Sequence, residues 1–184
     1  MSPTRVGGWS DDLRAALVAL GPRLRRFAYG LTGSPEEADD LVQSAYERAL
    51  TRSEQWKTGT RLDSWMYRIV QTIWFNRLET QKTRNRHLLT ISAGMEPAYD
   101  GHTQIESRIT LERIREFVWQ MPEEQRVVLL LVAVEGLSYK EASDVLGVPV
   151  GTITSRLGRA RIAIRDFTTG SSEEIAELKM VSKS

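Results

Sequence analysis

The chain has 184 residues, a formal net charge of +1 at pH 7 and a hydrophobic content of 41%. A chain of this length can bury a core and can hold one domain or two small ones. It has no cysteine, so it forms neither a disulfide nor a thiolate metal site, and its two histidines, His87 and His102, stand apart in a polar stretch. We therefore expect neither a metal nor a cofactor, and a reducing cytoplasm suits this composition.

The apolar residues do not predict a membrane protein. The most apolar run, from Val127 to Val134, is eight residues long, far short of the roughly 20 residues that span a bilayer. It predicts a buried helix. The N-terminal residues contain no basic segment followed by an apolar one, so we expect neither secretion nor membrane insertion.

Helical periodicity dominates the first half of the chain and indicates an all-α fold. Apolar residues recur every three or four positions from Leu13 to Leu31, and Gly33 is expected to end that helix. Ser34 as the N-cap, Pro35 at the first helical position and Glu37 as the partner in a capping box predict the start of the next helix. The expected apolar face of that helix consists of Ala38, Leu41, Val42, Ala45, Ala49 and Leu50.

A loop and a basic, aromatic helix follow. Residues 56–62, WKTGTRL, predict a loop, and a helix is expected from Asp63 to about Lys82. Aromatic residues among basic ones are typical of a platform on which unpaired bases stack. They are Trp56, Trp65, Tyr67, Trp74 and Phe75, of which Trp74 borders the apolar stripe and is expected in the core. Residues 83–104 show no period and predict a flexible linker.

The second half predicts a helix-turn-helix domain. A helix is expected over about 105–120, and an apolar helix ends at Gly136. Ser138 and Glu141 form a second predicted capping box, which opens a short helix ending at Gly147. A last helix is expected over about 150–167, before a polar tail at 169–184. In a helix-turn-helix motif the second helix enters the major groove of DNA.

The last helix concentrates positive charge. Between Val150 and Arg165 it has four arginines and no acid. Solvated helix faces usually mix charges of both signs, so this pattern favours DNA binding over a merely solvated helix. The stripe expected to face inward consists of Val150, Ile153, Leu157, Ala160, Ile164 and Phe167. The opposite face has mostly small residues, which permit close approach to base edges.

Three segments resemble a known family. LSYKEASDVLGVPVGTITSRLGRAR resembles the C-terminal DNA-binding domain of the bacterial extracytoplasmic-function (group 4) sigma factors. ADDLVQSAYERAL resembles the polymerase-binding helix of that family, and RLDSWMYRIVQTIWFNRLETQKTR resembles its segment for the melted promoter element. The resemblance implies a sigma-2-like helical domain at 11–82, a linker at 83–104, a sigma-4-like helix-turn-helix domain at 105–168 and a tail at 169–184.

The resemblance also implies three sets of binding residues. The set for the duplex −35 element is Thr152, Thr154, Ser155, Arg156, Gly158, Arg159 and Arg161. The set for the −10 element is Trp56, Lys57, Arg61, Trp65, Arg68, Thr72 and Asn76, with Thr72 standing where the family usually has asparagine. The set for core polymerase is Asp39, Asp40, Gln43, Glu47 and Arg48.

The implied partners are RNA polymerase core, through its β′ clamp coiled coil and β flap, promoter DNA as duplex and as melted non-template strand, and an anti-sigma factor. No Walker loop or catalytic triad is present, so we expect no enzymatic activity. One alternative is a helix-turn-helix regulator whose first half is a dimerisation or sensor domain. Another is an interaction module that titrates a different regulator.

Overall fold

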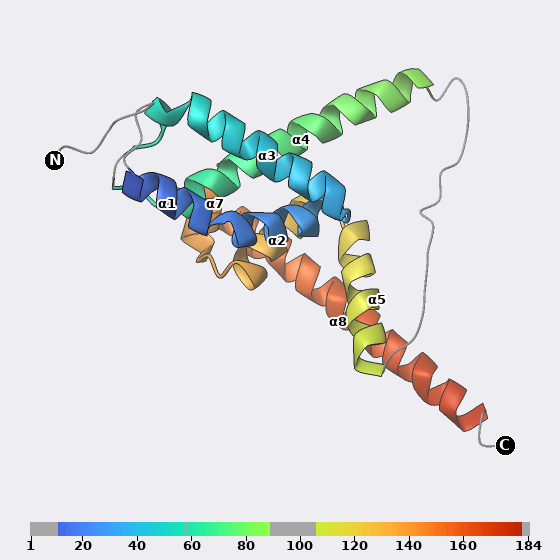
Figure 1. Cartoon of the computed structure of the whole chain (residues 1–184). Coiled ribbons are helices and arrows are strands. Elements are labelled where there is room, and N and C mark those ends of the chain that lie inside the picture. Colours follow the sequence, from blue (N-terminus) through green and yellow to red (C-terminus); the bar gives the residue numbers. More distant parts are fainter. Residues whose placement is uncertain (1–10, 58, 89–105, 182–184) are drawn as a thin grey trace. The chain divides into compact units, whose positions relative to one another are not determined.

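The computed structural model describes the backbone of residues 11–57, 59–88 and 106–181, and throughout these ranges the regular structure is helical. The all-α prediction is therefore confirmed. The chain divides into two compact units, Met1–Thr103 and Gln104–Ser184. The helices, labelled in Figure 1, are α1 (Asp11–Ala19), α2 (Gly21–Thr32), α3 (Pro35–Thr51), the 3₁₀ turn η1 (Ser53–Gln55), α4 (Leu62–Leu88), α5 (Glu106–Gln120), α6 (Glu123–Leu129), the π turn η2 (Leu130–Val134), α7 (Tyr139–Leu146) and α8 (Val150–Val181).

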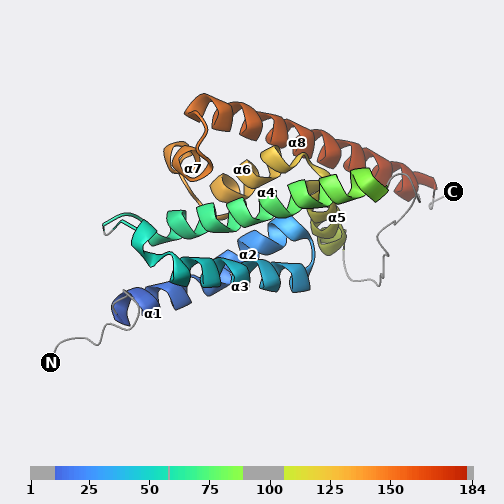
Figure 2. The ribbon, with the colours of Figure 1, turned by 90° about the horizontal axis from the view of Figure 1, so that it is seen from above.

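The core of the first unit lies where α2, α3 and α4 pack against one another. Figure 2 shows α3 and α4 side by side. Phe27 from α2 meets Tyr67 from α4 edge-on, with ring centroids 5.1 Å apart, and both side chains are fully buried. Other large side chains of this unit that are fully buried are Leu24, Leu31, Leu41 and Met66. Such burial stabilises a large apolar side chain by roughly 1.5 to 3 kcal/mol.

The continuous helix predicted from Leu13 to Leu31 is wrong. The structure has two helices there, α1 and α2, separated at Leu20. Pro22 stands in the first turn of α2. Proline lacks an N–H group and its ring clashes with the carbonyl four residues earlier, so it fits the start of a helix and not its interior. The apolar residues keep their helical spacing on both sides of Leu20, so the spacing alone predicts one helix.

The start of α3 agrees with the sequence in most respects. Gly33 ends α2 in the left-handed region, with φ at 78°. Ser34 Oγ accepts a hydrogen bond from the Glu37 main-chain N–H at 3.3 Å, and Pro35 occupies the first turn. The second half of the predicted capping box is not formed, because the Ser34 N–H donates to the Thr32 hydroxyl at 3.3 Å and not to the Glu37 carboxylate. Ser34 Oγ also donates to the Glu36 carboxylate at 2.9 Å.

Other local predictions also need correction. Leu50 is 52% exposed, although it was expected on the buried face of α3. Tyr67 is fully buried, so its ring belongs to the core and not to a stacking platform, whereas Trp74 is buried as expected. Two helices are longer than predicted: α4 continues to Leu88, into the predicted linker, and α8 continues to Val181, through most of the predicted tail.

In the second unit, α5, α6 and α7 pack against α8. Ile153 and Leu157 of α8 are buried with Val127 and Leu131 of the apolar run. Val150, expected on the same inward stripe, is instead 39% exposed because it is the first residue of α8 and lies at the edge of the core.

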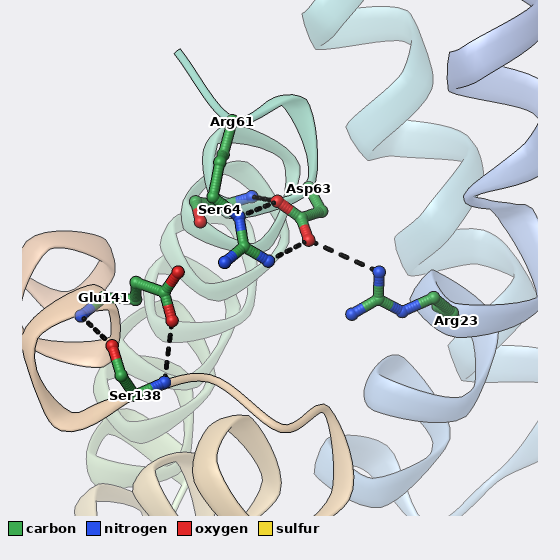
Figure 3. A network of polar contacts seen from close by, with 6 residues as sticks. All are labelled: Arg23, Arg61, Asp63, Ser64, Ser138 and Glu141. Carbon is green, nitrogen blue, oxygen red and sulfur yellow. Dashed lines mark hydrogen bonds and ion pairs between the residues drawn. The ribbon is translucent and has the colours of Figure 1, made fainter.

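Both ends of α7 have the caps that the sequence predicts. Ser138 Oγ accepts from the Glu141 N–H at 3.2 Å, and the Glu141 carboxylate accepts from the Ser138 N–H at 2.7 Å, as Figure 3 shows. This reciprocal capping box satisfies two otherwise unpaired donors at the start of α7. Gly147 ends α7 with φ at 66°, a conformation that glycine adopts without steric cost. The capping box therefore fixes where α7 begins, and Gly147 fixes where it ends before the turn into α8.

A buried arginine joins two helices of the second unit. The Arg126 side chain on α6 donates a hydrogen bond to the main-chain carbonyl of Trp119, in the last turn of α5. Burial lowers the pKa of Arg126, and the nearby Glu123 charge opposes this shift. Among the described residues, no helix is long and apolar enough to cross a membrane, and no group of His, Asp and Glu side chains could hold a metal ion.

Candidate nucleic-acid and polymerase interfaces

The exposed face of α8 near its N-terminus has small residues at Thr154, Ser155 and Gly158. The Thr154 and Ser155 hydroxyls donate to carbonyls of their own helix, at Val150 and Thr152, over 3.0 Å each. A Cβ added at Gly158 would meet no atom within 4 Å. Since the hydroxyls fold back and the glycine adds no side chain, this face can approach base edges closely.

The arginines of α8 differ in their surroundings. Arg156 forms an ion pair with Glu124 of α6 at 2.5 Å, and Arg165 pairs with Asp166 at 3.0 Å. Arg161 contacts the Tyr139 hydroxyl at 3.4 Å. Arg159 is exposed and forms no hydrogen bond or ion pair with any described residue. The expectation of unopposed charge is therefore wrong for Arg156 and Arg165, because the acids that pair with them, Glu124 and Asp166, lie outside residues 150–165.

The loop before α4 is anchored by a charged network, which Figure 3 shows from close by. Arg61 donates to both carboxylate oxygens of Asp63, from Nε at 3.0 Å and from Nη2 at 2.7 Å. Arg23 of α2 approaches the same carboxylate at 3.3 Å. Asp63 is only 9% exposed, and its Oδ1 also accepts from the Ser64 N–H at 2.7 Å.

These contacts decide the ionisation of Asp63. Burial raises the pKa of the carboxyl group. The hydrogen bonds from Arg61 and Ser64, with the charges of Arg61 and Arg23, outweigh burial, so the pKa of Asp63 lies below its usual value. The carboxylate is thus ionised at neutral pH and joins the loop to α2.

The rest of the loop is a tight turn with exposed polar groups. The Thr60 N–H and hydroxyl both donate to the Lys57 carbonyl, at 3.0 and 2.7 Å. Gly59 has φ at 88°, a conformation that other residues rarely adopt. Lys57 is exposed and Trp56 is half-buried. The structure therefore places Lys57 in solvent and ties Arg61 to Asp63.

One face of α4 presents the remaining residues of the predicted −10 set. Arg68, Thr72 and Asn76 follow one another at intervals of four residues, which places them in one row on the helix. Arg68 and Asn76 are exposed, while Thr72 is half-buried and its hydroxyl donates to the Arg68 carbonyl at 2.7 Å. Trp65 is half-buried. The row therefore offers a guanidinium and an amide for contact with nucleic acid.

The exposed ridge of α3 is mainly acidic. Asp39 forms an ion pair with Arg25 of α2 at 2.7 Å, and Gln43 donates to the Glu47 carboxylate at 3.1 Å. Asp40, Gln43 and Glu47 are exposed. The exposed Leu50 continues their spacing of three and four residues, and sequence analysis missed it because it was assigned to the core. Arg48 is half-buried and faces α4.

Each of the two units matches a known protein family model. The family model "Sigma-70, region 4" matches residues 111–164, and the model "Sigma2 domain of PhyR" matches residues 17–71. The ECF RNA polymerase sigma factor EcfG of Rhodopseudomonas palustris is 32% identical over 157 residues, 83% of this chain and 82% of that protein. SigW of Bacillus subtilis is 27% identical over 153 residues, 78% of this chain and 81% of that protein.

Solved structures share the fold. The sigma factor RpoE of Bartonella quintana, in complex with the anti-sigma factor NepR, has a TM-score of 0.71 at 24% identity, covering 86% of this chain and 97% of that chain. The PhyRSL–NepR complex from Sphingomonas has a TM-score of 0.61 at 22% identity, covering 84% of this chain and 87% of that chain.

Two helical units that match sigma domains in this order define a transcription initiation factor of bacterial RNA polymerase. The chain belongs to the extracytoplasmic-function family of RNA polymerase sigma factors.

Proposed function

We propose that the two units divide promoter recognition between them, with α8 binding the duplex −35 element and the first unit binding the melted −10 element. The single observation that supports this most strongly is the face of α8 around Gly158, which combines the small residues Thr154, Ser155 and Gly158 with the exposed charge of Arg159. A face of this kind suits insertion into the major groove, where arginine forms bidentate contacts with guanine.

The first unit supports the second half of the proposal. The loop at 56–61 lies directly before the helix whose exposed row includes Arg68 and Asn76. Cationic and aromatic groups beside a row of hydrogen-bonding groups suit a single strand, whose bases stack while its phosphates pair with arginine or lysine. Because this surface can hold a base only after the strands separate, binding energy favours the melted state.

The acidic ridge of α3 is the proposed docking site for polymerase core. Asp40, Gln43 and Glu47 point to solvent, so they contribute little to the fold and remain available to a partner. We assign the β′ clamp coiled coil to this ridge and the β flap to the second unit. The protein acts in the cytoplasm, on the nucleoid, without catalysing a reaction of its own.

An anti-sigma factor is the proposed regulator. RpoE of Bartonella quintana was solved in complex with the anti-sigma factor NepR, and its chain covers 86% of this one. An antagonist that covered the α3 ridge or the face of α8 would block initiation.

Promoter-dependent transcription with bacterial core polymerase tests the proposal. Core with this chain should initiate at promoters that core alone ignores, and permanganate should detect unpaired thymines at the −10 element. A helix-turn-helix regulator would instead bind its operator without core, as a dimer with half-sites about one helical turn apart. Tight sequence-specific binding by the isolated chain, with no transcription, would favour that alternative.

A further inference from the structure

The surface of the first unit has an open groove where the last turns of α3 meet the middle of α4. The residues that line it are Arg48, Ile73, Asn76, Arg77, Thr80 and Gln81. Figure 2 shows these two helices side by side. Ile73 is the one apolar residue among them, and the other five have polar or cationic end groups on stems that form much of the groove wall.

Neither guanidinium of this groove is neutralised by a carboxylate of the described residues. Arg77 Nη2 donates to the Ser44 hydroxyl at 2.9 Å and weakly to the main-chain carbonyl of Asp40 at 3.4 Å, and both acceptors are neutral. The Arg48 side chain forms no hydrogen bond or ion pair within the part of the chain that the structure describes. A guanidinium has five N–H donors, so both side chains keep donors for an anion. Ser44 meanwhile holds Arg77 in place.

The other polar groups of the groove also suit an anion. Asn76 and Gln81 have amide donors. Thr80 differs, because its hydroxyl already donates to the Asn76 carbonyl at 2.9 Å. Two guanidinium groups and two amides around one groove form a donor set for phosphate or carboxylate oxygens.

Continuity with the proposed −10 surface favours phosphate. Arg68, Thr72, Asn76 and Thr80 succeed one another every four residues, so the groove lies at the end of the same row of α4. Arg68 and Asn76 are separated by a rise of roughly 12 Å, which is the scale of a few nucleotides. A strand whose bases contact this row can extend its backbone into the groove.

The charge of α3 argues against a protein occupant. The exposed ridge beside the groove has the carboxylates of Asp40 and Glu47. A polymerase surface complementary to that ridge must be basic, and a basic surface would be repelled by Arg48 and Arg77. The two sides of α3 therefore suit partners of opposite charge.

We propose that the α3–α4 groove binds a backbone phosphate of the melted promoter strand, with Arg48 and Arg77 as its ligands. The inference rests on the proposed function of the first unit. It also moves Arg48 from the polymerase-binding set to the DNA-binding set.

The test compares Arg48→Gln and Arg77→Gln with the unaltered protein, each full-length and bound to core. Arg52→Gln is the matched control, because Arg52 is exposed just beyond α3 and outside the groove. The measurement is the affinity of holoenzyme for a single-stranded −10 oligonucleotide at several salt concentrations. Each groove variant should bind roughly fivefold more weakly or worse. Its slope of log affinity against log salt should flatten by about 0.7, the value for one phosphate of a single strand. The control should keep both quantities.

DNA in which one charged phosphate is replaced by an uncharged methylphosphonate identifies the phosphate that the groove binds. Replacing phosphates one at a time by methylphosphonate should reveal one position at which the unaltered protein loses affinity and Arg48→Gln loses no more. Arg48→Gln removes no hydrogen bond or ion pair with any described residue and keeps most of the side chain's stem, so its thermal unfolding should be unchanged, which separates binding from folding.

Two results would overturn the inference. Unchanged salt slopes with weaker core binding would assign the groove to an acidic segment of a protein partner. Unchanged slopes with unchanged core binding would leave the groove without a ligand. In both cases the unaltered holoenzyme would still transcribe from promoters, whereas loss of that activity in the unaltered protein would refute the proposed function itself.

Discussion

Replacing Asp63 by asparagine should destabilise the first unit. The carboxylate accepts two hydrogen bonds from Arg61 and one from the Ser64 N–H, and it pairs with Arg23. Asparagine keeps one oxygen for the Ser64 N–H but removes the charge. The side chains of Arg23 and Arg61 are 35% and 52% exposed, so water compensates part of the loss. We therefore expect a loss of roughly 1 to 3 kcal/mol, below the 3 to 5 kcal/mol for breaking a fully buried pair.

The assay is denaturant unfolding followed by tryptophan fluorescence, because four of the five tryptophans belong to the first unit. Asp144→Asn is the control, since Asp144 forms an exposed pair with Lys140, which contributes at most about 0.5 kcal/mol.

The pH dependence of the stability difference between the unaltered protein and Asp63→Asn provides a second measurement. Folding lowers the pKa of Asp63, so the folded state favours the ionised form. The stabilisation is complete above the unfolded pKa of about 3.9 and disappears as pH falls through the lower folded value. The difference in free energy of unfolding between the unaltered protein and Asp63→Asn should therefore be constant from neutral pH to about 5 and disappear below about 4. A gap that persisted unchanged at low pH, or an Asp63→Asn protein as stable as the control at pH 7, would refute the ionic account.

Three further predictions concern binding. Glu124→Gln frees Arg156 from its ion pair, so DNA affinity should rise and the salt slope on duplex should steepen by up to about 0.9; an unchanged slope in filter binding would mean that Glu124 does not restrain this charge. Gly158→Ala should stabilise the second unit by about 0.5 to 1 kcal/mol, since helical alanine is favoured and its Cβ meets open space, yet footprinting should show weaker −35 protection; unimpaired protection would place the DNA on another face. Asp40→Ala with Gln43→Ala should weaken core capture without lowering the melting temperature, because both side chains are exposed, and full retention of core would move the docking site elsewhere.

Local chemistry made much of this protein predictable from its sequence. Caps act within a few residues, so Ser34, Ser138, Gly33 and Gly147 could be assigned without knowledge of the fold, and the structure has helix ends at all four. Helical periodicity likewise identified the buried side of α8, including Ile153 and Leu157. The sequence also determined the family, because its motifs follow one another along the chain in the order of the two sigma domains.

Tertiary structure alone decided which charges are paired and which apolar residues are exposed. Glu124 lies 32 residues before Arg156, and Arg23 lies 40 residues before Asp63, so neither pair appears in any local pattern. Leu50 is apolar but continues the exposed ridge of Asp40, Gln43 and Glu47, whereas Ala49 beside it is fully buried against the other helices. Period specifies the direction of a side chain on its own helix, whereas burial and ion pairing depend on what another helix places opposite it.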